Sequence, residues 1–130
     1  MLIDDSASTN FLNEVILRDL DCAEHIDQCR NGIEALNYLQ TSIEGVYPQP
    51  DIIFLDINMP KMNGWEFLGE YENLSPDFRG KILMVMLTSS ANPDDKELAN
   101  STDTVHCFLN KPLTEEGVKG VLFDYFGWTE

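Results

Sequence analysis

Basic residues are scarce in this sequence: 8 Lys and Arg stand against 23 Asp and Glu over 130 residues, which gives a formal net charge of −15. A chain of this charge repels phosphate groups, so direct binding to nucleic acid or to an anionic membrane is not expected. Its partners are expected among cations, basic protein surfaces and phosphoryl groups brought in with a metal. The length predicts one domain over residues 1–130 with a core of its own.

Cysteine and long apolar runs are scarce too. The 3 Cys are an odd number without C-x-x-C spacing, and each lies in or beside an apolar stretch, which favours reduced thiols (Cys22, Cys29 and Cys107). No apolar run comes near the roughly 18 residues of a membrane-spanning helix, and the amino end lacks the basic-then-apolar pattern of a signal peptide. We therefore expect a cytoplasmic protein that is not inserted in a membrane.

Apolar runs of strand length alternate with segments of helical period along the chain. This alternation is typical of an α/β protein with a parallel sheet covered on both faces. Strands are predicted at residues 1–4, 23–29, 51–56, 82–88 and 105–109. Helices are predicted at residues 8–20, 31–39 and 64–74, from Asn92-Pro93 onward, and after a cap at Thr114. The chain therefore reads as five βα units.

Apolar residues at helical spacing predict which helix faces are buried. The first helix is expected to be amphipathic through Phe11, Leu12, Val15, Ile16 and Leu20. The last is expected to bury Val118, Val121, Leu122 and Phe126. The first strand is short, because only three residues precede Asp4 whereas a strand usually has five or six. We therefore expect the first strand to be truncated, with further residues upstream of Met1.

Charged and hydroxyl side chains follow four of the predicted strands. Asp4 and Asp5 follow the first, Asp56 ends the third, Thr88 ends the fourth, and Lys111 follows the fifth. The carboxyl ends of parallel strands meet at one edge of a sheet, where ligands bind in open α/β folds, so these side chains are expected to converge.

Three carboxylates at one edge repel one another, and Mg²⁺ is the cation that such an oxygen-rich cluster favours. Bound metal lets an anionic carboxylate meet an anionic phosphoryl donor, and aspartate can form an acyl phosphate, so Asp56 is the predicted nucleophile. Lys111 and the Thr88 hydroxyl are predicted to contact phosphoryl oxygens, and Ser89 adds a small side chain and an N–H group.

Each of these residues also has an ordinary interpretation. An Asp-Asp pair commonly caps a helix, Asp56 can be a turn residue, Thr88 suits a strand, and Lys111 can be a solvated loop residue. Phe108 by itself indicates a core residue. Only the occurrence of all the polar groups at one edge favours a site.

The residues that carry these features resemble a known family, the receiver domain of two-component response regulators. The resemblance spans the chain and rests on Asp4-Asp5, on Leu55-Asp56-Ile57-Asn58-Met59-Pro60 with Met62-Asn63-Gly64, on Thr88-Ser89 and on Lys111-Pro112. It implies a doubly wound five-stranded parallel sheet of flavodoxin-like order 2-1-3-4-5. It also implies that a histidine kinase or histidine phosphotransfer protein phosphorylates Asp56.

The resemblance further implies roles for the remaining residues. Asp5, Asp56 and the Asn58 carbonyl would bind Mg²⁺, with Asp4 acting through water, and Lys111 would pair with the phosphoryl group. Thr88 would move onto that group and Phe108 would turn inward, although many family members have tyrosine at the latter place. The change would alter the face of the fourth helix, fifth strand and fifth helix, where a downstream protein or a phosphorylation-linked second copy would bind.

Two other functions remain open from the sequence. A degenerate receiver would bind partners without being phosphorylated. A phosphatase of the haloacid dehalogenase class also has an Asp nucleophile after an apolar strand, but it needs a second Asp two residues on, where this chain has Asn58. We therefore expect a phosphoacceptor with only self-catalysed phosphorylation and dephosphorylation rather than an enzyme, and a receiver that stands alone because the chain ends after the fifth helix.

Overall fold

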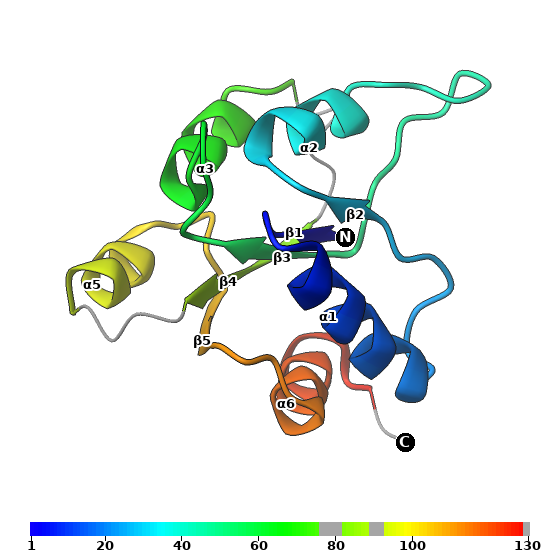
Figure 1. The fold of residues 1–130 in the computed structure, drawn as a ribbon, viewed down its shortest axis with the longest axis vertical. Coiled ribbons are helices and arrows are strands. Elements are labelled where there is room, and N and C mark those ends of the chain that lie inside the picture. Colours follow the sequence, from blue (N-terminus) through cyan, green and yellow to red (C-terminus); the bar gives the residue numbers. More distant parts are fainter. Residues whose placement is uncertain (76–81, 89–92, 129–130) are drawn as a thin grey trace.

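The computed structural model of the protein describes residues 1–75, 82–88 and 93–128. Five parallel strands form one sheet in the order β2-β1-β3-β4-β5 (Figure 1). The strands are β1 (Leu2–Ile3), β2 (Gln28–Cys29), β3 (Ile52–Asp56), β4 (Leu83–Thr88) and β5 (Cys107–Asn110). The predicted fold class and strand order are confirmed.

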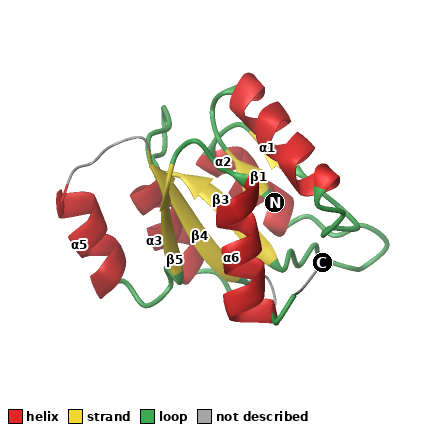
Figure 2. Ribbon diagram, turned by 90° about the horizontal axis from the view of Figure 1, so that it is seen from below, coloured by secondary structure: helices red, strands yellow, loops and turns green. Residues whose placement is uncertain are grey.

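Helices cover both faces of this sheet. They are α1 (Ala7–Asp19), α2 (Gly32–Leu39), α3 (Gly64–Glu72), α5 (Pro93–Ser101) and α6 (Glu115–Phe126). Figure 2 shows α1 and α6 on one side of the sheet and α2 and α3 on the other, and α5 contacts β5. As predicted, Thr114 caps α6, accepting a hydrogen bond from the N–H of Gly117. Within the described residues, no helix has both the length and the apolar character needed to cross a membrane.

Two apolar clusters form the core. The cluster between the sheet and α2–α3 includes Leu39 and Phe67, and the cluster between the sheet and α1–α6 includes Leu17 and Val118. Successive residues of β1 alternate between them, because side chains of a strand point to opposite faces of the sheet. Met1 and Ile3 belong to the α2–α3 cluster and Leu2 to the α1–α6 cluster.

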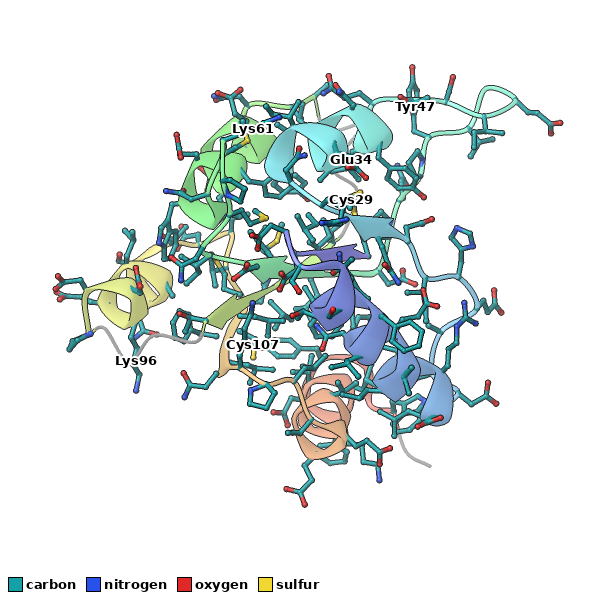
Figure 3. All side chains as sticks on the ribbon, in the orientation of Figure 1. Cys29, Glu34, Tyr47, Lys61, Lys96 and Cys107 are labelled. Carbon is teal, nitrogen blue, oxygen red and sulfur yellow. The ribbon has the colours of Figure 1, made fainter. Side chains whose placement is uncertain are left out.

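The three cysteines are free, as predicted. Cys29 on β2 and Cys107 on β5 lie at opposite edges of the sheet (Figure 3). Burial is the main cause that raises the pKa of Cys29, to about 12, so this thiol stays protonated at neutral pH.

The second strand is much shorter than predicted. The sequence pattern places it at residues 23–29, whereas β2 contains only Gln28 and Cys29. The cause lies in its neighbour, since β1 offers only Leu2 and Ile3 as pairing partners. A strand at the edge of a sheet has no second neighbour to extend it.

The buried face of α1 also differs from the prediction. Phe11, Leu12 and Val15 are exposed, at 62%, 59% and 38%, while Asn10 and Asn13 are buried beside Leu17. Asn10 decides the rotation of the helix, because its Nδ2 donates to the carbonyl oxygens of Asp4 and Cys29, at 3.0 and 3.2 Å. Phe11, Leu12 and Val15 therefore face outward, whereas Ile16 and Leu20 pack against the α1–α6 cluster, as predicted.

The end of α6 is a second correction. Val118, Val121 and Leu122 are buried as predicted, but Phe126 is exposed. Gly127 adopts a left-handed conformation with φ of 63°, which ends the helix and turns the chain back. Trp128 then packs against the α1–α6 cluster, and its N–H donates to the carbonyl of Leu122.

Candidate functional site

The predicted site residues meet at the carboxyl edge of the sheet. Asp4 and Asp5 directly follow β1, Asp56 is the last residue of β3, Thr88 is the last residue of β4, and Lys111 directly follows β5. Ser89 lies outside the described residues. The topology alone brings these positions together, because all five strands run in the same direction.

Three carboxylates form a compact cluster. One oxygen from each of Asp4, Asp5 and Asp56 lies within 4.8 Å of the other two. Asp4 and Asp56 are buried, each 3% exposed, and Asp5 is half-buried. Hard oxygen ligands from one or two carboxylates are what Mg²⁺ requires, so this donor set fits the predicted metal.

The ammonium group of Lys111 joins two of these acids. Its Nζ lies 2.7 Å from Oδ2 of Asp4 and 3.1 Å from Oδ1 of Asp56. Burial alone would lower the pKa of Lys111, but the hydrogen bond to Asp4 and the charge of Asp56 outweigh it, and the pKa is raised. Lys111 is therefore a permanent cation at neutral pH.

Asp56 is held in an unfavourable environment for its charge. Burial, followed by the charge of Asp4, raises the pKa of Asp56 against the opposing effects of Lys111 and of the Asn58 N–H, which donates to Oδ1 at 3.3 Å. A poorly solvated carboxylate with a cation beside it to offset its charge is suited to act as a nucleophile.

Polar contacts that the sequence analysis did not identify hold the acid pair in place. The N–H of Ser6 donates to Oδ1 of Asp4 at 2.9 Å, and Nε of Arg30 donates to the carbonyl of Asp5 at 2.9 Å. Nδ2 of Asn10 donates a hydrogen bond to the carbonyl oxygen of Asp4, as described above. A signal for Asn10 was present: two asparagines, Asn10 and Asn13, stand at the helical spacing of Leu17.

The loop between β3 and α3 requires a glycine. A Cβ atom on Gly64 would lie 2.8 Å from the carbonyl oxygen of Asp56 and 2.9 Å from Cα of Ile57, which real structures do not tolerate. The N–H of Gly64 donates to the carbonyl of Ile57, and Asn63 forms a capping box with Glu66. The start of α3 is thereby fixed against the end of β3.

Thr88 and Phe108 lie on the two strands beyond Asp56. Thr88 is fully buried, and its carbonyl accepts a hydrogen bond from the N–H of Lys111 at 2.7 Å. Phe108 stands opposite Met86 in the β4–β5 ladder, and its half-buried ring packs against the α2–α3 cluster. A hydrogen bond that the sequence analysis did not identify links α3 to α5. Nε1 of Trp65 on α3 donates to the carboxylate of Asp95 on α5 at 3.3 Å.

Comparison with known proteins agrees with this geometry. The family model of the response regulator receiver domain matches residues 1–122. Response regulator Rcp1 of Synechocystis sp. is 34% identical over 114 residues, which cover 85% of this chain and 74% of that protein.

Solved structures agree as well. A two-component response regulator from Cytophaga hutchinsonii superimposes with a TM-score of 0.86 at 32% identity, covering 98% of this chain and 95% of that chain. The Mn²⁺-bound form of response regulator Rcp1 superimposes with a TM-score of 0.66 at 30% identity, covering 99% and 94%. This chain therefore belongs to the receiver-domain family of two-component response regulators.

Proposed function

We propose that this receiver domain is a signalling switch in which Asp56 accepts a phosphoryl group from a histidine kinase or a histidine phosphotransfer protein. The observation that carries the proposal is the meeting of buried Asp56 with Asp4, Asp5 and the Lys111 ammonium at one sheet edge. No other arrangement of charged groups among the described residues combines a nucleophile, a cluster of metal-type ligands and a cation.

Mg²⁺ is the proposed cofactor. Asp5, Asp56 and the carbonyl of Asn58 would hold it directly, with Asp4 acting through water. When bound, Mg²⁺ neutralises carboxylate charge so that an anionic phosphoryl donor can approach. The mutual proximity of the three carboxylates supports this assignment, and so does the Mn²⁺-bound form of the related Rcp1.

The chain's own residues would act on the transferred group as follows. An oxygen of Asp56 forms a bond to phosphorus while the bond from phosphorus to the donor histidine nitrogen breaks, and the bonding electrons leave with that nitrogen. Lys111 then pairs with a phosphoryl oxygen in place of the Asp56 oxygen that it now contacts. The Thr88 hydroxyl and the N–H groups around Ser89 would contact the remaining oxygens.

The readout would be a local change that spreads along β4 and β5. Thr88 moving onto the phosphoryl group leaves space into which Phe108 turns, and this alters the face formed by α5, β5 and α6. A downstream protein, or a second copy of the phosphorylated chain, would bind there. We place this switch in the cytoplasm as a phosphoacceptor rather than an enzyme, since Asn58 stands where a phosphatase would need its general acid.

Intact mass after incubation with a small acyl-phosphate donor and Mg²⁺ tests the proposal. We expect one phosphoryl group to be gained by the natural chain and by the surface control Asp124→Asn, and none by Asp56→Asn or in the presence of EDTA. A folded sample that gains no phosphoryl group under these conditions would instead be a degenerate receiver that binds partners independently of phosphorylation.

A further inference from the structure

Helix α5 is attached to the rest of the domain by little apolar contact. Of its 9 residues only Ala99 is buried, and Leu98 is 45% exposed. By comparison, α3 buries Phe67, Leu68 and Tyr71. A helix that buries so little apolar surface gains little stability from packing. Its position on the domain therefore depends more strongly on its polar contacts.

Two hydrogen bonds tie α5 and the turn after it to α3, one at each end. At the amino ends of the two helices, Nε1 of Trp65 donates to Oδ1 of Asp95 at 3.3 Å. Near their carboxyl ends, Oγ1 of Thr104 donates to Oε1 of Glu72 at 2.6 Å. Figures 1 and 2 both show α3 as the helix nearest to α5. We call these two hydrogen bonds the α3–α5 clasp. Contacts at both ends fix the direction of α5 as well as its place beside α3.

Trp65 connects the clasp to the interior of the domain. Its ring packs against the α2–α3 cluster while its N–H reaches Asp95. The ring of Phe108 on β5 packs against the same cluster. In the switch proposed above Phe108 turns inward, which changes the packing of the cluster that supports the Trp65 ring. The hydrogen bond to Asp95 depends on the position of that ring, because hydrogen bonds weaken steeply with distance and angle.

The strength of the clasp suits a restraint that can be released. The Trp65–Asp95 pair is partly buried and the Thr104–Glu72 pair is exposed. Water can replace either partner when such a bond opens, so each bond changes the equilibrium between two positions of α5 by only roughly two- to tenfold. Two such bonds favour one position of α5 without making the other inaccessible.

We propose that the α3–α5 clasp holds α5 in the position of the unphosphorylated chain and opposes the switch, with Trp65 as the positioning residue that couples α5 to Phe108. The inference rests on the proposed function, since phosphorylation of Asp56 supplies the change at Phe108. A chain without the clasp occupies the switched state more often before it is phosphorylated. Weakening the clasp therefore raises the affinity for a mimic of the phosphoryl group without altering any residue at the carboxyl edge.

Binding of beryllium fluoride with Mg²⁺, a non-covalent mimic of the phosphoryl group, measures this effect. The chain has 2 Trp, so a Trp128→Phe background leaves Trp65 as the sole fluorescent reporter of binding. In this background we expect Asp95→Ala to bind the mimic roughly three- to tenfold more tightly. Asp95→Asn keeps an oxygen acceptor for the indole N–H, so its affinity is expected to stay near that of the background chain.

Glu97→Ala is the matched control, because Glu97 is an exposed acid on α5 outside the clasp. We expect this variant to bind beryllium fluoride as the background chain does. Equal tightening by Asp95→Ala and Glu97→Ala would reduce the effect to the loss of one negative charge and would overturn the proposal. A background chain that binds no beryllium fluoride would contradict the phosphoacceptor role of Asp56 and, with it, the coupling of the clasp to the switch.

Amide hydrogen exchange of residues 93–101 tests the restraint itself, without metal or mimic. We expect α5 to exchange several-fold faster in Asp95→Ala and in Thr104→Val than in the natural chain or in Glu97→Ala. In a Trp65→Phe chain, which lacks the indole donor, Asp95→Ala should add no further increase. Natural exchange rates in both clasp variants, or an undiminished effect of Asp95→Ala in the Trp65→Phe chain, would overturn the clasp whatever the result with beryllium fluoride.

Discussion

Lys111 and Asp4 are separated by 107 residues in the sequence, yet Nζ of Lys111 lies 2.7 Å from Oδ2 of Asp4. The same ammonium reaches Asp56 at 3.1 Å, so one cation from the β5 end binds the acids at the ends of β1 and β3. Both carboxylates are buried. The pair interactions therefore matter for folding as well as for the proposed chemistry.

Replacing the cation tests its structural role. Lys111→Met leaves two buried carboxylates without a counter-charge, and we expect a loss of about 3 kcal/mol in the free energy of unfolding near pH 7. Urea denaturation measures it. Lys96→Met on α5 is the control, since Lys96 is exposed and lies away from the site (Figure 3), and it should change stability by less than about 0.5 kcal/mol. Equal effects of the two variants would contradict the role of Lys111.

The raised pKa of Asp56 predicts how stability depends on pH. The folded chain holds the proton of Asp56 more tightly than the unfolded chain, whose carboxyl titrates near its ordinary value of 3.8. The stabilising contribution of Asp56 to the free energy of unfolding is thus fully present below this unfolded-state pKa. It is lost as the pH rises through the higher pKa of the folded state. Lys111, whose pKa is raised, stays charged across this range.

The variant Asp56→Asn cannot ionise at this position, so it avoids the loss of stability that ionisation of Asp56 causes as the pH rises. We expect this variant to be more stable than the natural chain near pH 7, with an advantage that shrinks as the pH is lowered toward 4. Urea denaturation of both chains at several pH values gives the comparison. An advantage that grows on acidification would mean that Asp56 is stabilised in its charged form instead.

Two glycines of α3 provide a matched pair. Gly64→Ala puts a Cβ atom within 3 Å of backbone atoms of Asp56 and Ile57, so we expect α3 to be displaced and stability to fall by roughly 2 kcal/mol or more. Gly69→Ala meets nothing within 4 Å and should stabilise the chain by about 0.5–1 kcal/mol through helix propensity. Thermal unfolding distinguishes them, and a neutral Gly64→Ala would disprove the close approach.

Asn10 is expected to hold the acid pair through the backbone. Asn10→Ala leaves the buried carbonyls of Asp4 and Cys29 without this donor, and should cost about 1–3 kcal/mol in unfolding free energy. Asn37→Ala, at an exposed place on α2, is the control and should be near neutral. Similar stability of both variants would show that the Asn10 amide does not anchor α1.

The meeting of the site residues at one edge could be predicted from the sequence because each of them ends or directly follows an apolar run, whereas the strand order was implied by the family resemblance. Asp56 after Ile52–Leu55 and Lys111 after β5 need only the parallel topology to meet. The rotation of α1 could not be predicted from apolar spacing, since it depends on Asn10 reaching two carbonyls that lie on different strands. The length of β2 likewise depends on how many residues β1 offers for pairing.

The contact that Arg30 makes with the acid pair could not be predicted from the sequence either. Arg30 follows β2 and donates to the backbone of Asp5, a contact that carries no side-chain pattern. The preference of Lys111 for Asp4 over Asp56, 2.7 against 3.1 Å, is likewise a matter of tertiary packing. The sequence indicates which functional groups meet at the carboxyl edge of the sheet. The tertiary structure determines which of these groups are in contact.

Identification of the phosphorylated carboxylate tests the central claim most directly. An acyl phosphate is reduced by borohydride, which converts the modified aspartate to homoserine, and fragmentation of the peptides of residues 1–18 and 31–61 then locates the changed residue by mass. We predict homoserine at position 56 alone, dependent on Mg²⁺ during phosphorylation. Homoserine at Asp4, Asp5 or Asp51, or the same yield without metal, would contradict the account.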